Sequence, residues 1–338
     1  MTERRYDSTE RPLVSILIPV FNREELIGRC VGSAVAQTYR NIEVVVCDNA
    51  SSDRTRDVVR SFAEKDPRVR LFENSSNLGP TRNWLRCLEL SRGEYIVFLW
   101  SDDFLLPGFL TELVPLLSHH ENAGFAYCPA ILQSAATGEK TILYTPAKGG
   151  LFPSSAYIQD SLLRANSNMP VSPACALFRK SDAICNLEPY IPNSLSDDSR
   201  AHGIGPDLLL FLKTANEYSH IAVTTKPLVV FWSHDSSITV SSDIAYLFFR
   251  YDLARLYFSS VHQKSLICAF ISELFIHKLR FLRSSDYYNF RLWRLYRNMG
   301  CSRFHIAKIF VRIVRILASR IIRRPHRSDR ASVGEPTR

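Results

Sequence analysis

The chain has 338 residues, of which 46% are hydrophobic and 22% are charged, a composition typical of a globular protein with one large domain and an appendage, or with two domains. The polar N-terminus MTERRYDSTERP lacks the apolar core of a secretory signal. Because the sequence also has no run of about 18 uninterrupted apolar residues, we expect neither export by a standard signal nor a membrane span. Eight scattered cysteines without a CxxC pair predict reduced thiols in the cytosol rather than a zinc site or a disulfide framework.

The formal net charge of +9 is concentrated near the C-terminus. Between Ile276 and Arg330 the sequence holds 15 lysines and arginines against two aspartates, a net charge of +13, so the rest of the chain carries −4. The sequence therefore predicts a mildly acidic body followed by a cationic C-terminal region.

Strand and helix patterns alternate along the first part of the body. Short apolar strand patterns cover residues 13–20, 42–48, 68–74 and 94–100, and helical patterns cover residues 23–37, 51–66 and 79–93. This alternation predicts an α/β fold whose central sheet is mainly parallel and is flanked by helices. In such sheets, ligands bind at the carboxyl ends of the strands.

Polar residues follow three of these strand patterns. In the stretch FLWSDDFLLP, Asp102 and Asp103 come directly after the fourth strand pattern. Asp48 is the last residue of the second strand pattern, and Pro19 to Arg23 lie at and just past the end of the first. Two adjacent carboxylates repel each other unless they are solvated or a cation lies between them and an anionic ligand. The pair is therefore interpreted either as a Mg²⁺ or Mn²⁺ site for a diphosphate or as a cap of the helix that Pro107 would begin.

Two common nucleotide-binding motifs are missing from the sequence. No G-x-G-x-x-G motif follows the first strand pattern, and no G-x-x-x-x-G-K-[ST] motif occurs. Dehydrogenase and P-loop ATPase functions are therefore disfavoured.

Two long blocks carry a family resemblance. VSILIPVFNREELIGRCVGSAVAQTYRNIEVVVCDNASSDRT and NLGPTRNWLRCLELSRGEYIVFLWSDDFLLPGFL, between residues 14 and 110, resemble the nucleotide-binding half of a family 2 inverting glycosyltransferase of GT-A fold. Several separated blocks in the right order make this resemblance specific. It implies a GT-A fold with a Rossmann-like central sheet, and the helical pattern beyond residue 244 predicts a C-terminal helical extension.

The resemblance also implies roles for individual residues. Pro19 resembles the residue that lines the nucleotide base, Asp48 the aspartate that bonds uracil, and Arg82 an arginine that approaches the base and diphosphate. Asp102 and Asp103 resemble the D-x-D-type pair, one near the ribose and one on a Mn²⁺ or Mg²⁺ ion. The remaining residues assigned to donor binding are Phe21, Asn22, Arg23 and Asn49.

Two positions depart from the family pattern. Trp100 stands where many relatives have the first aspartate of D-x-D-D, and Asn49 replaces the second acid of the common D-D-G-S block. The first departure leaves fewer carboxylates for a metal. The donor sugar is therefore not predicted.

The second half is expected to supply the acceptor side and the base. Residues 130–170 read as irregular, residues 172–182 as a strand leading into a turn, and residues 203–217 as a helix with Asp207 in its first turn. Asp207 resembles the aspartate of the family's E-D block, which deprotonates the acceptor hydroxyl, although Pro206 replaces the glutamate. The alternative is a helix start favoured by the macrodipole alone. Asp197 and Asp198 are reserve candidates that read more readily as a solvated loop.

A histidine follows the last strand pattern of the body. His234, in FWSHDSSIT, resembles the family's histidine-containing segment and is assigned to the metal or diphosphate, with a purely structural histidine as the alternative. The Q-x-x-R-W block of processive synthases is absent. A single-transfer enzyme is therefore predicted.

The C-terminal region is helical and basic. In RFHIAKIFVRIVRILASRIIRR, residues 303–324, a polar stripe of Lys308, Arg312, Arg315, Ser319 and Arg323 runs along an apolar helix. This pattern suits the surface of an anionic membrane, and packing on the catalytic domain or on a partner helix is the alternative. No nucleic-acid partner is predicted.

These observations predict a domain organisation and a function. The expected segments are a disordered 1–11, a GT-A domain over 12–240 (donor half 12–128, acceptor half 129–240), a helical region over 241–325 and a disordered tail over 326–338. The expected function is metal-dependent, inverting transfer of a sugar from a nucleoside diphosphate, preferably UDP, to a glycan or lipid-linked acceptor in surface polysaccharide, O-antigen or glycolipid assembly. The enzyme would be cytoplasmic and peripheral on the inner face of the membrane. The alternative is a catalytically silent nucleotide-sugar-binding scaffold.

Overall fold

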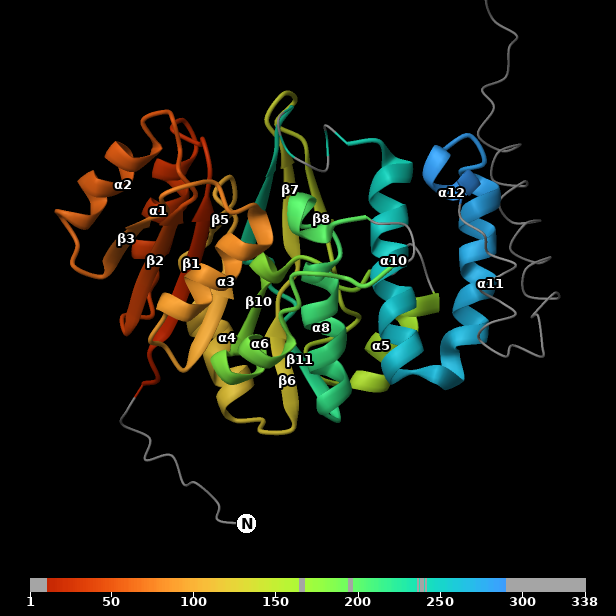
Figure 1. Ribbon diagram of the computed structural model, residues 1–338. Coiled ribbons are helices and arrows are strands. Elements are labelled where there is room, and N and C mark those ends of the chain that lie inside the picture. The colour runs from red at the N-terminus through yellow and green to blue at the C-terminus, as the bar shows by residue number, and fades with distance from the viewer. Residues whose placement is uncertain are drawn as a thin grey trace, which may run out of the picture.

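A computed structural model of the chain describes residues 11–163, 168–193, 197–235, 237, 240 and 242–289. An eight-stranded sheet with the order β3-β2-β1-β4-β10-β6-β11-β9 forms its centre, and a four-stranded sheet has the order β5-β12-β7-β8 (Figure 1). Hydrophobic clusters fill both faces of the large sheet. This architecture confirms the predicted α/β class.

The N-terminal half follows the predicted alternation. Its elements are β1 (Val14–Val20), α1 (Ile27–Val35), β2 (Ile42–Asp48), α2 (Thr55–Ala63), β3 (Val69–Glu73), α3 (Pro80–Leu90) and β4 (Tyr95–Phe98). The four strands pair in parallel. Because β1 and β2 are buried on both faces, their sequences read as unbroken apolar runs. Their carboxyl ends meet at one edge of the sheet, where the predicted donor residues Pro19, Phe21, Asn22, Asp48 and Asn49 lie.

The next segment departs from the sequence prediction. A short strand β5 (Phe104–Leu105) follows the two aspartates, and α4 (Phe109–Ser118) begins two residues after Pro107. Residues 130–170 were predicted to be irregular, and this was wrong: the segment contains β7 (Ala130–Ser134), β8 (Lys140–Leu143), β9 (Gly150–Pro153) and α5 (Ser154–Leu163). β7 and β8 are half-exposed. Long buried apolar runs are therefore missing from this part of the sequence.

The remaining elements complete both sheets and add helices. They are β6 (Ala123–Tyr127), the 3₁₀ turn η1 (Pro173–Cys175), β10 (Ala176–Arg179), α6 (Lys180–Asn186), α7 (Ser199–His202), α8 (Pro206–Glu217), β11 (His220–Val223) and β12 (Val229–Ser233). β12 pairs with β7 in parallel and with β5 in the antiparallel sense. The second sheet therefore brings the segment after β12 next to the segment after β4.

Three helices follow the sheets: α10 (Ile244–His262), α11 (Lys264–Arg280) and α12 (Ser285–Asn289). Figure 1 places them at the opposite side of the molecule from α2 and β3. They share the hydrophobic cluster of α3, α5 and α8, and this confirms the predicted helical character of residues 244–289. The basic helix predicted over residues 303–324, the N-terminal residues 1–10 and the tail 326–338 lie outside the described residues.

A buried polar cluster joins these helices. Asp252 accepts hydrogen bonds from Arg255 Nη1 at 3.2 Å and from the Tyr287 hydroxyl at 2.7 Å, and His277 Nδ1 lies 2.7 Å from its second carboxylate oxygen. Such a cluster stabilises the fold only while every member is paired.

Two findings bear on the expectations about membranes and cysteines. Within residues 11–289, in the part that the structure describes, no helix is both long and apolar enough to cross a membrane. Six of the described cysteines are free thiols, as predicted, but Cys268 is disulfide-bonded, so the prediction of eight reduced cysteines was wrong.

Candidate donor and acceptor site

The loops after β1 and β2 are joined by hydrogen bonds. The backbone N–H of Asn22 donates to Ser51 Oγ at 2.9 Å, and that of Arg23 donates to Thr55 Oγ1 at 2.8 Å. Asn22 has φ of 49°, a left-handed conformation that asparagine tolerates better than most residues. Together these contacts form a fixed platform beside Asp48.

Other predicted donor residues differ in accessibility. Pro19 is buried within β1. The side chain of Phe21, which directly follows β1, is 42% exposed. Arg82 is exposed in the first turn of α3. An exposed ring and an exposed guanidinium on neighbouring elements could contact a base and a phosphate.

Asp48 is the buried polar group of this platform. It is completely buried at the end of β2, where Oδ2 accepts a hydrogen bond from the backbone N–H of Ser51 at 3.0 Å. Oδ1 is also buried and has no hydrogen-bond partner among the described residues. Because an unpaired buried carboxylate oxygen is costly, this atom is suited to accept a hydrogen bond from a ligand N–H group.

Asn49 lies beside Asp48 but uses its side chain internally. Nδ2 donates to Asn77 Oδ1 and to the carbonyl oxygen of Gly79, and Oδ1 accepts from Asn74 Nδ2 and the backbone N–H of Leu78. These contacts use the full hydrogen-bonding capacity of a carboxamide. Asn49 therefore holds the loop before α3 against the end of β2.

The two aspartates of WSDD have different environments. Asp103 is buried, and its Oδ1 accepts a hydrogen bond from the backbone N–H of Trp232 in β12 at 3.0 Å. Burial, reinforced by the neighbouring charge of Asp102, raises the pKa of Asp103 well above its usual range. Asp102 is half-buried, and its Oδ2 lies 3.1 Å from His234 Nε2. Asp103 thus ties the two sheets together, and Asp102 forms a pair with His234.

The Asp102–His234 pair is a candidate partial metal site. A carboxylate oxygen and an imidazole nitrogen are both suitable ligands for Mn²⁺. Among the described residues, however, no group of three or more His, Cys, Asp or Glu side chains is arranged to hold a metal ion. The residues therefore fit a cation that takes its remaining ligands from a diphosphate and water, as Mg²⁺ commonly does.

Trp100, two residues before Asp102, packs its indole ring against two aromatic side chains. Its ring centroid lies 4.8 Å from that of Trp84 in α3 and 6.0 Å from that of Phe98. Its Nε1 donates to Ser172 Oγ at 2.9 Å. Trp100, which stands where the family resemblance expects an acid, therefore packs between α3, β4 and the segment before η1.

Asp207 lies in the first turn of α8. Oδ1 accepts hydrogen bonds from the backbone N–H groups of Gly205 (2.9 Å) and Leu208 (2.8 Å), and Oδ2 accepts one from the hydroxyl of Tyr251 in α10 (2.8 Å). Burial raises the pKa of Asp207 to about 6, although these hydrogen bonds oppose the rise. Burial raises the pKa of Tyr144 well above its usual range, and the charges of Asp207 and Asp103 add to this rise.

The reserve candidates Asp197 and Asp198 are both paired. Asp198 caps α7, accepts from the backbone N–H of Arg200 at 3.0 Å and forms an ion pair with its side chain at 2.8 Å. Asp197 is only 14% exposed and contacts His202 and Arg250. A solvated loop was therefore the wrong interpretation for Asp197.

A family model described as "Glycosyl transferase family 2" matches residues 15–186, just over half of the chain. The chain belongs to glycosyl transferase family 2. This finding confirms the predicted family, and with it the glycosyltransferase class of enzyme.

Curated relatives of this family 2 protein match parts of their own length. An uncharacterized glycosyltransferase of Haemophilus influenzae is 36% identical over 121 residues, 35% of this chain and 48% of the relative. The GalNAc(5)-diNAcBac-PP-undecaprenol beta-1,3-glucosyltransferase of Campylobacter jejuni is 34% identical over 117 residues, 34% of this chain and 37% of the relative. The matches thus span less than half of these relatives.

A solved structure supports the GT-A type of fold. TarS of S. aureus, residues 1–349 in complex with UDP-GlcNAc, matches with a TM-score of 0.59 at 17% identity, covering 79% of this chain and 73% of that chain. At this identity the likeness establishes the fold alone.

Two residues that contact the predicted site residues of this glycosyltransferase were missed from the sequence. Arg29 of α1 lies over the rings of Phe104 (4.5 Å) and Trp232 (4.1 Å), and it donates to the backbone carbonyl of Asp102 at 3.1 Å. Tyr251 contacts Asp207 from α10. Arg29 lies within the first quoted block but the resemblance gave it no role, and Tyr251 stands in no motif, so the sequence indicated neither residue.

Proposed function

We propose that this family 2 glycosyltransferase transfers a sugar from a UDP-sugar to a hydroxyl group of a lipid-linked glycan, once per encounter and with inversion. The observation that carries the proposal is that the unpaired oxygen of Asp48, at the end of β2, and Asp102, which follows β4, lie at carboxyl ends of strands of the same sheet, and that Asp102 pairs with His234. UDP-GlcNAc is the ligand of TarS, and the C. jejuni relative is named for a diphosphoundecaprenol-linked substrate.

The donor would bind across the ends of β1, β2 and β4. In this proposal, Asp48 Oδ1 accepts a hydrogen bond from the uracil N–H, Phe21 and Pro19 contact the base, and Arg82 approaches the diphosphate. Asp102 and His234 would hold a Mn²⁺ or Mg²⁺ ion, which when bound stabilises the charge that develops on the leaving diphosphate. Asp103 stabilises the loop that carries Asp102, and Arg29 partly offsets the charge of the two aspartates.

Asp207 is the proposed base. With a pKa of about 6 it is ionised at neutral pH, and a carboxylate base of this kind contributes roughly 10² to 10⁴ in rate. It would take the proton of the acceptor hydroxyl while the hydroxyl oxygen bonds to the anomeric carbon and the bond to the diphosphate breaks. A single displacement of this type inverts the anomeric centre.

The catalytic unit would comprise residues 12–240, with the donor half over 12–128 and the acceptor half over 129–240. The cationic helical region would bring the enzyme to the inner face of an anionic membrane, where lipid-linked acceptors are found. This location would suit an enzyme of surface polysaccharide, O-antigen or glycolipid assembly.

One observation favours a second candidate function. Both oxygens of Asp207 already accept hydrogen bonds within the fold, and this is also what a purely structural helix cap would show. A nucleotide-sugar-binding scaffold without transfer activity would retain the donor platform and lack a working base. Donor binding and transfer therefore have to be measured separately.

Calorimetry with UDP, with and without Mn²⁺, tests the donor site. The native chain is compared with Asp102→Asn and with the control Asp57→Asn, which changes an exposed aspartate of α2. We expect Mn²⁺ to strengthen UDP binding in the native chain and the control but not in Asp102→Asn. If Mn²⁺ does not change the affinity of the native chain for UDP, the proposed metal dependence is refuted. If UDP does not bind, the proposal of a UDP-sugar donor is refuted.

Transfer is tested with the same protein, UDP-sugars and diphosphoundecaprenol-linked glycans. Formation of a lengthened glycan supports the enzyme. UDP binding without transfer from any donor would favour the scaffold.

A further inference from the structure

The α7 segment, residues 197–205, connects the donor side of the proposed site with the base. A Cβ atom at Gly79, just before α3, would lie 2.8 Å from the carbonyl oxygen of Arg200, so the two backbones touch there. The other end of the segment runs directly into α8 and Asp207. A displacement of this segment would therefore move Asp207 relative to α3.

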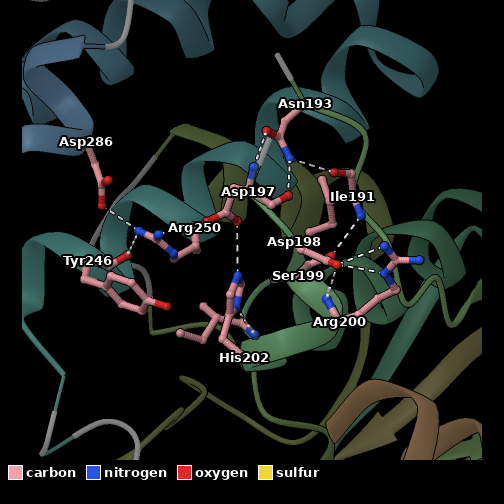
Figure 2. Close-up of polar contacts among 12 residues, drawn as sticks. Ile191, Asn193, Asp197, Asp198, Ser199, Arg200, His202, Tyr246, Arg250 and Asp286 are labelled. Carbon is pink, nitrogen blue, oxygen red and sulfur yellow. Dashed lines mark hydrogen bonds and ion pairs between the residues drawn. The ribbon is translucent and has the colours of Figure 1, made fainter. Parts of the chain in front are cut away.

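His202 closes the turn at the end of the α7 segment (Figure 2). Its Nδ1 accepts a hydrogen bond from the backbone N–H of Ile204 at 3.0 Å, so in the neutral ring the proton lies on Nε2. Nε2 lies 3.1 Å from Asp197 Oδ2 and donates to it. The ring thus connects the two ends of the segment.

Arg250 of α10 fastens this turn to the helical region. Figure 2 shows its guanidinium between two carboxylates: Nη2 lies 2.8 Å from Asp197 Oδ1, and Nη1 donates to Asp286 Oδ2 at 2.6 Å. The guanidinium carbon also lies 3.5 Å from the centroid of the Tyr246 ring. These contacts connect α7, α10 and α12.

The burial of Arg250 makes this connection important. Its side chain is only 11% exposed, and its Nε has no hydrogen-bond partner among the described residues, so the ion pairs offset the cost of burying the charge. Removal of one partner from such a pair leaves the other charge buried and uncompensated. Without Arg250, Asp197 would move toward solvent and the segment would lose its fixed position.

The part of α10 that carries Arg250 also contacts Asp207, so these ion pairs lie next to the proposed base. The residue next to Arg250 in α10 is Tyr251, whose hydroxyl donates to Asp207 itself. A Cβ atom at Gly205 would lie 3.2 Å from Ala254 Cβ, so α10 also packs closely on the turn. One turn and a half of α10 therefore contacts both the base and the segment that leads to it.

We propose that His202 and Arg250 are positioning residues of the transfer reaction. Acting through Asp197, they fix the turn that presents Asp207 to the acceptor hydroxyl, and they make the helical region a part of the active centre. In this proposal neither residue touches the substrate. This inference rests on the proposed function, in which Asp207 is the base.

Two pairs of variants test the inference in the full chain. Arg250→Met removes the charge and Arg250→Lys retains it. His202→Ala removes both contacts of the ring, and in His202→Asn the side-chain oxygen can replace Nδ1 as the acceptor for Ile204. The matched control is Arg86→Met, which removes an exposed arginine of α3 whose partner Glu89 lies 3.6 Å away.

The expected result is a loss of kcat with intact donor binding. Arg250→Met and His202→Ala should lower kcat about 100-fold, because a small misplacement of a reacting group costs about that factor. UDP affinity and donor KM should stay within twofold of the native values. Arg250→Lys and His202→Asn should restore part of kcat, and Arg86→Met should behave like the native enzyme.

Hydrogen exchange of the peptide covering residues 203–210 gives a readout that needs no turnover. We expect faster exchange in His202→Ala and Arg250→Met than in the native chain and the control. If Arg250→Met does not fold, Arg250→Lys and the two His202 variants carry the test.

The outcomes separate this inference from the proposed function. Unchanged kcat and unchanged exchange in folded variants, or a parallel loss of UDP affinity, would overturn the positioning role while native transfer stands. Absence of transfer by the native protein would overturn the proposed function and, with it, any role of these residues in catalysis.

Discussion

Replacement of Asp207 by asparagine should remove activity and increase stability above about pH 6. The pKa of Asp207 is about 6, against an ordinary value of about 3.9, a difference of about two units. Because its folded pKa is raised, Asp207 contributes stability that is complete below about pH 4 and is lost as the pH rises through 6. At about 1.4 kcal/mol per unit, ionisation in the folded state costs about 3 kcal/mol.

Asparagine is suited to this test because it can preserve the contacts. Its Oδ1 can accept from the N–H groups of Gly205 and Leu208, and its Nδ2 can donate to the Tyr251 oxygen, so the start of α8 should persist. The carboxamide does not ionise. The variant should therefore not lose stability between pH 4 and 7 through this residue.

The assay is urea unfolding of the native chain, Asp207→Asn and the control Asp57→Asn at several pH values between 4 and 8, with turnover measured at neutral pH. We expect Asp207→Asn to gain up to about 3 kcal/mol over the native chain above pH 6 and to lose at least about 100-fold in kcat. If the free energy of unfolding of the native chain and of Asp207→Asn depends on pH in the same way, the raised pKa of Asp207 is refuted. If Asp207→Asn retains the native kcat, the role of Asp207 as the base is refuted.

Three further predictions concern single contacts. Tyr251→Phe removes a hydrogen bond that lowers the pKa of Asp207, so the acid limb of the pH–kcat profile should shift upward by about one unit; an unchanged limb would contradict this. Asp252→Ala leaves Arg255 buried without its partner and should cost about 3 to 5 kcal/mol in urea unfolding, whereas a loss below about 1 kcal/mol would show that the cluster is dispensable. Gly205→Ala forces a side chain into φ of 103° and to 2.7 Å from Ile191 Cδ1, so it should lower the Tm of the whole protein, and an unchanged Tm would argue against this backbone geometry.

The N-terminal half was predictable because its signals are local. β1 and β2 are unbroken apolar runs, and a residue at the end of such a strand has to lie at the edge of the sheet, so the position of Asp48 followed from the sequence. The β7–β8 hairpin was missed because Lys140 and Thr141 are exposed. Strand β12, with which β7 pairs, lies 99 residues further along the chain, and no local pattern reports that contact.

The details of the site depend on such distant contacts. Asp102 and Asp103 are neighbours with the same side chain, yet Asp103 faces the interior because Trp232, 129 residues later, donates to it. Arg29 was missed for the same reason, since the rings that hold it come from β5 and β12. Sequence could therefore indicate the residues at this edge but not which of them face a ligand.

The placement of the indole rings makes the site optically visible. The chain has four tryptophans, and three of them, Trp84, Trp100 and Trp232, lie around the WSDD loop. The fourth, Trp293, lies outside the described residues. Intrinsic fluorescence of the unlabelled protein should thus be dominated by the surroundings of Asp102. A change in emission on adding a nucleotide would report occupancy at this loop, without a dye or a coupled reaction.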